Sequence, residues 1–308
     1  MKSLMLGKKN IIVTGATGTI GSTLVEALLA LNHHVIVIVR NLEKSTQLFS
    51  NRVTHVVFDG AAFSDDLTHY NAEIVIHLAS LSTSQDDKSN IVNLIDSNIV
   101  FVSLLLDALK NSPLKLFVNA GSFSEFYTNN GTIDPTYFYS ATKTASRFII
   151  DYFSKVNGFI FLNAILYSVY GKRGEHKKIF DIMMDAMGSQ EPVAMSEGRQ
   201  ILDFIHIDDV IRFYLLLIET YDNLPDRYNE YHLGTGKGTS IRELAEIFYE
   251  QCQMHPNIVW DAIQSRKRDT IIATADTQKV FKDIGWQADI FLKTGIKQYL
   301  VKYGSQDD

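Results

Sequence analysis

Apolar and polar positions follow two alternating patterns through the first half of the chain. Runs such as residues 35–39 (VIVIV) are continuously apolar, which is typical of a strand that a parallel sheet buries on both faces. Segments with the helical apolar period separate these runs, so the pattern predicts repeated strand–helix–strand units. The predicted strands are residues 10–14, 35–39, 53–58, 74–78, 114–118 and 159–166, and the predicted helices are residues 20–31, 91–110 and 139–156.

The alternation weakens after Gly171, where helical stretches are separated by loops that contain glycine or proline. These helices are predicted at residues 178–187, 208–220, 240–251, 276–283 and 291–303. The sequence therefore predicts an α/β fold in two parts. Residues 1–170 form a doubly wound parallel sheet, and residues 171–308 form a smaller, mostly helical domain, with allowance for strands that interleave between the two.

Composition narrows the class of protein. The 308 residues include 29 Lys and Arg against 35 Asp and Glu, a net charge of −6, so we expect no nucleic-acid partner. The single cysteine, Cys252, excludes an internal disulfide and fits a reducing compartment. No run approaches the roughly 18 apolar residues of a membrane span, and the N-terminus has no signal-peptide pattern. We expect a cytoplasmic protein that is not in a membrane.

The histidines show no metal-binding spacing. His33 and His34 are expected at the surface, because no third ligand is spaced near them. His206 lies in a strand-like apolar run and is expected to be a partly buried, hydrogen-bonded residue. We expect no bound metal.

Three glycines lie between the first predicted strand and the first predicted helix. Gly15, Gly18 and Gly21 have G-x-x-G-x-x-G spacing, which chance would produce about 0.06 times in this chain. Gly15 permits a tight turn, Gly18 lets a pyrophosphate approach the backbone, and Gly21 lets the helix pack on the strand. Amides at the helix N-terminus then face the phosphates. A plain glycine-rich turn is the alternative, but this position favours a dinucleotide site.

The residue that ends the second predicted strand bears on the choice of dinucleotide. NAD-binding folds usually place Asp or Glu about 20 residues after the glycines, where it binds the ribose 2′-hydroxyl. Here the strand ends in Arg40. A guanidinium suits a 2′-phosphate, so we favour NADP and keep NAD open, since an arginine at a strand end is also often only solvated.

Tyr139 and Lys143 are four residues apart and therefore share one face of a predicted helix. A nearby ammonium favours the phenolate and so lowers the pKa of the tyrosine. Such a phenol can exchange a proton with a carbonyl or alcohol while hydride moves to or from a nicotinamide. Roughly one such spacing is expected by chance, but this pair opens the helix that follows the fifth predicted strand.

The two motifs together resemble the extended short-chain dehydrogenase/reductase family of nucleotide-sugar epimerases, dehydratases and reductases. Further segments match that family in the same order over most of the chain: residues 76–79, Asn98, residues 166–171, 203–210, 231–236 and 285–286. The resemblance implies a Rossmann-like NAD(P)-binding domain over residues 1–170 and a nucleotide-sugar substrate domain over residues 171–308. It also implies a homodimer formed through the helices 91–110 and 139–156.

With the two motifs, the resemblance assigns the cofactor site. Its predicted residues are Gly15, Thr17, Gly18, Thr19, Ile20, Gly21, Arg40, Asp59, Gly60, Leu78, Ala79, Ser80, Asn98, Tyr139 and Lys143. The predicted catalytic residues are Ser122, Tyr139 and Lys143, and the predicted substrate-binding residues are Ser82, Ser124, Glu125 and Arg268.

The chain departs from the family pattern at the catalytic hydroxyl. The family usually has Ser or Thr four residues before a tyrosine, where this chain has Phe123 between two serines. Ser122 is the first candidate for the hydroxyl that polarises the carbonyl, and Ser124 is the second. Either serine could instead hydrogen-bond the loop backbone. Leu202 replaces a usual arginine, and Arg268 could contact a diphosphate or be solvated surface charge.

Three functions remain open. Residues 119–127 and 203–209 are most similar to the 4-ketoreductases that finish CDP- or dTDP-linked dideoxysugars, the group of the CDP-abequose and CDP-paratose synthases, in surface-polysaccharide biosynthesis. A 4-epimerase or 4,6-dehydratase that retains its cofactor is the second, because Glu125 aligns with the dehydratase glutamate. A non-catalytic NADP-binding regulator is the third, and the retained Tyr139 and Lys143 argue against it. Fold alone does not separate these functions.

Overall fold

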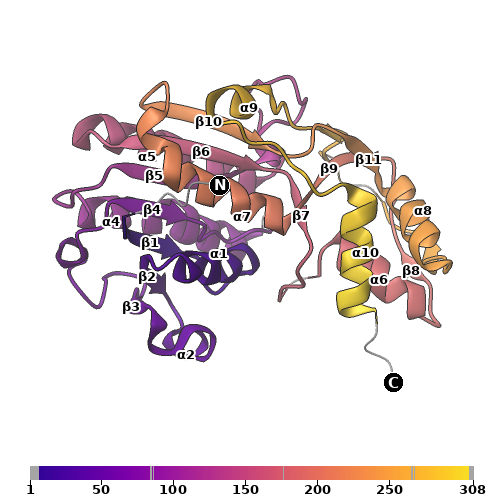
Figure 1. The fold of residues 1–308 in the computed structure, drawn as a ribbon. Coiled ribbons are helices and arrows are strands. Elements are labelled where there is room, and N and C mark those ends of the chain that lie inside the picture. The colour runs from indigo at the N-terminus through magenta and orange to yellow at the C-terminus, as the bar shows by residue number, and fades with distance from the viewer. Residues whose placement is uncertain are drawn as a thin grey trace. The chain divides into compact units, whose positions relative to one another are not determined.

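The structure, a computed structural model, describes residues 7–83, 85, 87–175, 177–264, 266 and 268–304. The chain forms two compact units (Figure 1). The first unit comprises residues 1–122, 137–165 and 211–231, and the second comprises 123–136, 166–210 and 232–308. The chain thus passes between the units several times. The division into domains at residue 170 stays a prediction, because compactness alone does not define a folding domain.

The first unit is built on a seven-stranded sheet with the strand order β10-β6-β5-β4-β1-β2-β3 (Figure 1). The pairs that join β3, β2, β1, β4 and β5 are all parallel. The order reverses between β1 and β4, and open parallel sheets bind ligands beyond the carboxyl ends of the strands at such a point. The strands are β1 (Asn10–Thr14), β2 (His34–Val39), β3 (Thr54–Val57), β4 (Ile74–His77), β5 (Leu116–Ser122), β6 (Ile160–Leu166) and β10 (Tyr228–Leu233).

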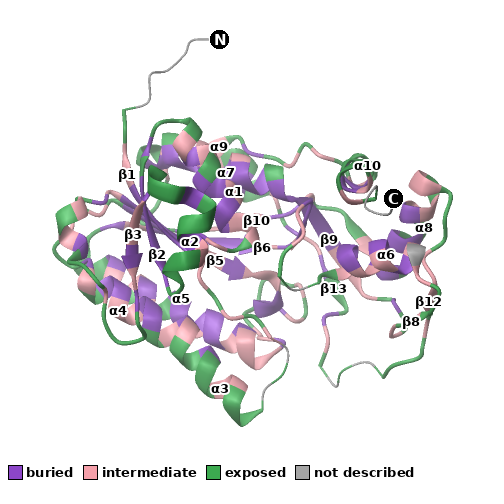
Figure 2. Cartoon of the chain, turned by 90° about the horizontal axis from the view of Figure 1, so that it is seen from below, coloured by how far each residue is buried: buried purple, intermediate pink, exposed green. Residues whose placement is uncertain are grey.

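Helices cover both faces of this sheet. In Figure 2, α4 and α5 lie on one face and α1 and α7 on the other, with buried residues between them. On the α4 and α5 face, Phe117 and Phe161 of the sheet pack with Leu105 and Ile150 of the helices. The helices are α1 (Thr19–Ala30), α2 (Leu42–Phe49), α3 (Lys88–Ile95), the π-helical η3 (Asp96–Val100), α4 (Phe101–Ala108), α5 (Phe138–Asn157) and α7 (Ile207–Thr220), with short 3-10 turns η1 (Ser50–Arg52), η2 (Leu67–Tyr70) and η5 (Tyr221–Asn223).

The second unit is organised around β9 (Ile201–His206). This strand pairs in parallel with β7 (Ser168–Tyr170) and β13 (Ile272–Ala273) and antiparallel with β11 (Gly238–Ser240). Two further strands, β8 (Val193–Ala194) and β12 (Ile258–Val259), pair with each other. The remaining elements are η4 (Phe123–Glu125), α6 (Ile179–Gly188), α8 (Ile241–Cys252), α9 (Gln278–Ile284) and α10 (Leu292–Tyr303).

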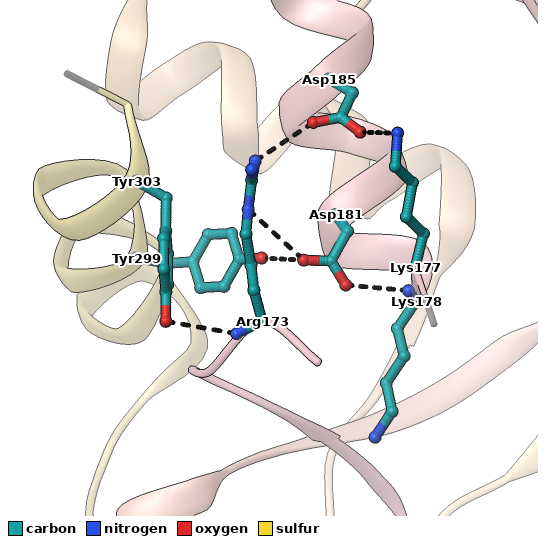
Figure 3. A network of polar contacts seen from close by, with 7 residues as sticks. All are labelled: Arg173, Lys177, Lys178, Asp181, Asp185, Tyr299 and Tyr303. Atoms are coloured by element: carbon teal, nitrogen blue, oxygen red, sulfur yellow. Dashed lines mark hydrogen bonds and ion pairs between the residues drawn. The ribbon is translucent and has the colours of Figure 1, made fainter. Parts of the chain in front are cut away.

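A polar network fixes α10 to α6 in the second unit (Figure 3). The hydroxyl of Tyr299 donates to the buried carboxylate of Asp181. Arg173 lies 3.6 Å from Asp181 and 3.1 Å from Asp185, and its backbone N–H donates to the hydroxyl of Tyr303. Because burial raises the pKa of Tyr299, its hydroxyl keeps its proton and remains a donor to Asp181 at neutral pH.

The predicted elements agree with the observed ones except at a few places. The predicted helix 91–110 begins at Lys88 and contains the π-helical segment η3. The helix α2 and the strand β10 were not predicted, since α2 is mostly polar and β10 was interpreted only as a glycine motif. In the second unit the strands β7, β8, β11, β12 and β13, of two or three residues each, were not predicted either, and β9 was recognised only as a strand-like run around His206. The expectation of a surface position for His33 is wrong: its side chain is buried and Nδ1 accepts a hydrogen bond from the backbone N–H of Lys9.

Among the described residues, one helical stretch, Lys88–Ala108, has the length and hydropathy of a membrane span. That measure depends on length and composition only, and a helix of a soluble protein can satisfy it. About a third of its most apolar window (33%) is buried within the fold.

Candidate active site

The glycine loop joins β1 to α1 by a close approach to the chain after β4. Gly15 has φ +67°, and a Cβ there would come 2.6 Å from the backbone nitrogen of Ala79. Gly18 is the N-cap of α1 and makes no side-chain cap hydrogen bond, and Thr17, Thr19 and Ile20 flank it. The first amides of α1 and the positive end of its dipole are suited to a phosphate. The tight turn at Gly15 and the glycine N-cap agree with the predicted phosphate loop, and the binding of a pyrophosphate there stays a prediction.

Two charged residues follow the neighbouring strands β2 and β3. Val39 and Val57 are paired in register, so Arg40 and Asp59 lie at the same carboxyl edge of the sheet, and both are exposed. Backbone amides of Ala62 and Ala61 donate to the Asp59 carboxylate at 2.8 Å each and hold its pKa below its usual value. The adjoining Gly60 has φ +109°. This edge thus presents a guanidinium and an ionised carboxylate.

His77 lies at the end of β4 beneath the predicted cofactor loop. Its Nδ1 is 2.8 Å from the hydroxyl of Thr14, which also accepts from the backbone N–H of Ala79 at 3.1 Å. Burial, and then the charge of Lys143, lower the pKa of His77 to about 3. The imidazole is therefore neutral at physiological pH. The loop that follows is more open, since Leu78 and Ala79 are half-buried and Ser80 and Ser82 are exposed.

Asn98 connects this loop to the helix that carries the tyrosine and the lysine. Its amide nitrogen donates to the hydroxyl of Thr142 at 2.9 Å and to the carbonyl of Leu81 at 3.0 Å. Its amide oxygen accepts from the backbone N–H of Leu81 at 2.9 Å and from the hydroxyl of Ser80 at 3.2 Å. The residue lies in the π-helical segment η3, a feature that is frequent at functional sites. The sequence predicted only a cofactor-binding role for Asn98. In the structure its side chain also joins the loop after β4 to α5.

The three predicted catalytic residues all lie in the first unit. Ser122 is the last residue of β5, and Tyr139 is in the first turn of α5, which packs on β5. Both are half-buried, whereas Lys143, one turn after Tyr139, is only 2% exposed. The backbone N–H of Tyr137 donates to Ser140 at 2.8 Å and fixes the start of α5. A hydroxyl, a phenol and a buried ammonium are therefore held by two adjacent elements.

The segment after Ser122 belongs to the second unit and is packed tightly. Phe123 stacks on Tyr167, with ring centroids 5.7 Å apart, so the residue at the family's usual hydroxyl position is part of an aromatic contact. Ser124 and Glu125 are buried, at 4% and 0% exposure. Ser122 is the more accessible serine.

Arg268 also lies in the second unit. Its side chain is 43% exposed but contacts other side chains as well as solvent. Its guanidinium pairs with Asp134 and lies 4.2 Å from the ring centre of Tyr127. A diphosphate bound by Arg268 would therefore compete with Asp134. The predicted substrate contacts of Ser82, Ser124, Glu125 and Arg268 stay predictions.

Asp203 is a buried organising residue whose role the sequence analysis missed. Its carboxylate accepts from the backbone N–H groups of Thr235, Gly236 and Ala275 at 2.8, 2.8 and 3.2 Å and from the hydroxyl of Thr235 at 2.7 Å. Burial raises its pKa. The D-F-I-H segment was available as a signal, but which groups it would face depends on the tertiary pairing of β9. No group of three His, Cys, Asp or Glu suited to a metal occurs within the described part of the chain, and the absence of a metal stays a prediction.

The chain matches a known family over most of this architecture. The model of the NAD dependent epimerase/dehydratase family matches residues 11–234. The chain belongs to this family. This confirms the resemblance to the extended short-chain dehydrogenases/reductases and the assignment of the chain as an enzyme of that type. The Rossmann-like α/β fold predicted from the sequence is also confirmed.

Individual relatives cover from two thirds of the chain to nearly all of it. It is 30% identical over 301 residues to a CDP-abequose synthase of Salmonella typhimurium, which covers 95% of this chain and 98% of that protein. It is 31% identical to a CDP-abequose synthase of Yersinia pseudotuberculosis over 69% of this chain and 76% of that one. The structure of MoeE5 in complex with UDP-glucose and NAD has a TM-score of 0.84 at 23% identity, covering 97% of this chain and 100% of that one.

Proposed function

We propose that this enzyme reduces the C4 ketone of a nucleotide-linked 4-keto-6-deoxyhexose in surface-polysaccharide biosynthesis, with NADPH as the hydride source. The observation that carries the proposal is the buried ammonium of Lys143 one helical turn after Tyr139, beside a neutral His77. An ammonium at that place favours ionisation of the phenol and prepares it for proton exchange with a ketone. Similarity to CDP-abequose synthases over nearly the full chain supports the substrate class.

Each catalytic side chain has a distinct role in this reduction. Tyr139 gives a proton to the ketone oxygen, and Ser122 donates a hydrogen bond that polarises the same carbonyl. Lys143 lowers the pKa of Tyr139 and, by analogy with the family, holds the nicotinamide ribose. The reduced nicotinamide supplies the hydride when it is bound. The glycine loop and the uncapped start of α1 suit its pyrophosphate.

We infer that the cofactor is NADP rather than NAD. The exposed guanidinium of Arg40 stands where NAD-binding folds usually place a carboxylate, and it matches a 2′-phosphate. The solved structures to which the chain is similar include several in complex with NAD. NAD therefore remains the second candidate.

A second candidate function keeps the same site but retains its cofactor. Glu125 is completely buried, and a 4,6-dehydratase needs a carboxylate to remove the C5 proton of the sugar. The chain is also 24% identical to a putative UDP-glucose 4-epimerase of Methanocaldococcus jannaschii, which keeps the epimerase reaction open. A non-catalytic regulator is disfavoured, since Ser122, Tyr139 and Lys143 are all present on β5 and α5.

We infer that the enzyme is a cytoplasmic homodimer joined through α5 and the neighbouring helices α3 and α4. Phe148, Tyr152 and Val156 form a stripe along α5 at 60–63% exposure. Val92 and Val100 add exposed apolar side chains beside it, where α3, η3 and α4 contact α5. A two-fold axis through this face would bury the stripe against its own copy. Sedimentation velocity with Tyr152→Glu tests this, since a charge in the stripe is expected to give monomers.

The test of the reaction is a direct assay of reduced-nicotinamide absorbance with a CDP- or dTDP-linked 4-keto-6-deoxyhexose. We expect one NADPH to be oxidised per ketone reduced, and freshly purified enzyme to carry little cofactor. Conversion of a nucleotide hexose to its 4-keto-6-deoxy product without NADPH consumption would instead establish the dehydratase.

A further inference from the structure

Two adjacent lysines before α6, Lys177 and Lys178, have ammonium groups in different surroundings. The ammonium of Lys177 lies 2.6 Å from the Asp185 carboxylate, and its side chain is 72% exposed. The ammonium of Lys178 instead donates a long hydrogen bond, 3.4 Å, to the backbone carbonyl of Val169 in β7. Figure 3 shows the two side chains running in opposite directions, that of Lys177 toward Asp185 and that of Lys178 away from it. Lys177 therefore has an anionic partner, and Lys178 faces β7.

The backbone of Lys178 is held by the polar network of the second unit. Its N–H donates to the Asp181 carboxylate at 2.8 Å, directly before the first residue of α6. That carboxylate is itself buried and fixed, since it accepts from the hydroxyl of Tyr299 and lies 3.6 Å from Arg173. The side chain of Lys178 thus extends from a fixed point. A fixed point of attachment reduces the ordering that a ligand at the ammonium would have to impose.

The ammonium of Lys178 has unused hydrogen-bonding capacity. An ammonium carries three N–H donors, and among the described residues the only acceptor within reach is the carbonyl of Val169. Nor does any carboxylate in the described part of the chain form an ion pair with it, because Asp181 binds the backbone N–H instead. A single long bond to a neutral carbonyl is a weak structural role for a cation. The ammonium can therefore accept an anionic partner without losing one.

Lys178 is accessible but incompletely hydrated. The residue is exposed, yet the protein around the ammonium excludes enough water to lower its pKa, and the charge of Asp181 opposes this only in part. An anion that binds there favours the charged form of the lysine again. Charge-assisted hydrogen bonds are also stronger where water is partly excluded. These surroundings favour the binding of an anion.

We propose that the ammonium of Lys178 binds a phosphate of the nucleotide-sugar substrate. This inference rests on the proposed function, because it takes the anion to be the diphosphate of that substrate. The predicted pyrophosphate loop of the cofactor, at Gly15–Gly21, belongs to the first unit, whereas Lys178 and the residues that hold it belong to the second. We therefore assign the phosphate to the substrate and not to the cofactor. Lys178 is a substrate-binding residue that neither motif indicated.

The first test is a calorimetric titration of the complete enzyme with CDP, dTDP and UDP. The nucleoside diphosphate that binds most tightly becomes the probe. Lys178→Met is expected to weaken its binding at least about tenfold, because a charge-assisted bond to phosphate is lost. Lys178→Arg is expected to retain most of the affinity. The nucleoside of the same base carries no phosphate and is expected to bind the wild type and Lys178→Met equally.

Lys177 supplies a matched control one residue away. Lys177→Met removes the same charge, but from an ammonium that already pairs with Asp185. We expect its affinity for the probe to equal that of the wild type. The melting temperature of Lys178→Met is expected to stay near that of the wild type, since the hydrogen bond to Val169 is long.

The second test uses the unaltered enzyme and therefore does not depend on the folding of a variant. Lysines are acetylated with acetic anhydride, and the modified peptides are quantified by mass spectrometry. At saturation the probe is expected to slow the acetylation of Lys178 at least about fivefold and to leave that of Lys177 unchanged. The nucleoside alone and NADP alone are expected to give no protection.

Equal affinity of the wild type and Lys178→Met for the probe would overturn the inference, and so would an equal loss in Lys177→Met. Protection of Lys178 by NADP as strong as that by the probe would assign the phosphate to the cofactor and would also overturn it. Neither test needs a sugar ketone or a hydride donor. Failure of the ketone assay would thus affect the proposed reaction without deciding this inference.

Discussion

The side-chain amide of Asn98 donates to the hydroxyl of Thr142 at 2.9 Å and thereby joins the π-helical segment η3 to the helix of Tyr139 and Lys143. The same amide binds both the N–H and the carbonyl of Leu81 in the loop after β4. Asn98 is 2% exposed, so water cannot easily replace these bonds. One residue thus links the predicted cofactor loop to the predicted proton donor.

Asn98→Ala is expected to reduce kcat/KM for NADPH about tenfold or more. The change leaves backbone groups of Leu81 and the hydroxyl of Thr142 without their partner, at about 1–3 kcal/mol for a buried group. Steady-state kinetics with varied NADPH measures the effect. Asn93→Ala, at an exposed position of α3, is the control and is expected to behave as wild type. Equal kinetics in both variants would contradict the positioning role of Asn98.

Tyr139→Phe is expected to lower turnover at least about 100-fold, the usual scale for the loss of a positioned acid, while cofactor affinity stays near wild type. Lys143→Met is expected to weaken both turnover and cofactor binding, since its ammonium serves the phenol and the ribose. Turnover is followed by NADPH absorbance and binding by fluorescence titration. Near-normal turnover of Tyr139→Phe would exclude this phenol as the proton donor.

Local pattern was sufficient to predict the elements that form the cofactor half of the site. The β1 strand is observed at Asn10–Thr14 as predicted, and α5 extends only one residue further at each end. Both have strong apolar periodicity and are bounded by clear start or stop residues. The glycine spacing likewise predicted the strand–turn–helix junction, because that turn excludes a Cβ.

Features that depend on distant segments could not be predicted in this way. Arg147 is an ordinary helical charge in the sequence, and only the position of β10 at the sheet edge gives it Glu230 as a partner. The buried state of His33 depends in the same way on the chain around Lys9. These contacts could not be predicted because the two partners are far apart in the sequence, and not because their local segments have weak structural propensity.

Arg40→Asp is expected to reverse the preference for NADP over NAD. A guanidinium–phosphate contact is worth about 1–3 kcal/mol, and a carboxylate at this place repels the 2′-phosphate while it can bind a 2′-hydroxyl. Binding titrations with both cofactors give the ratio. Arg52→Asp makes the same change of charge at the exposed ion pair between Arg52 and Glu26, and it serves as the control. An unchanged affinity ratio in Arg40→Asp would remove Arg40 from the site.

His77 is expected to make the enzyme less stable in mild acid. Its folded pKa of about 3 lies below the usual value of 6.5, so between these values the unfolded chain binds a proton that the folded chain does not. Stability therefore falls as the pH decreases through this window, by at most about 1.4 kcal/mol per pH unit. Melting temperatures between pH 7 and pH 5 measure the slope. His77→Gln should make the slope smaller, whereas His34→Gln, at an exposed position, should not. Burial also lowers the pKa of His33 and His206, so part of the slope should persist in His77→Gln.

The serines and Glu125 distinguish the reductase from the dehydratase. Ser122 is half-buried at the end of β5, and Ser124 is 4% exposed, so Ser122→Ala is expected to lose more turnover than Ser124→Ala. A ketoreductase needs no base for the C5 proton, whereas a dehydratase does. Glu125→Gln is therefore expected to keep most of the ketone-reducing activity, measured by NADPH absorbance. Glutamine is close in volume to glutamate, so this change removes the charge with little change in packing. A loss of more than about 100-fold, the scale for a lost general acid or base, would make Glu125 part of the reduction and would contradict this prediction.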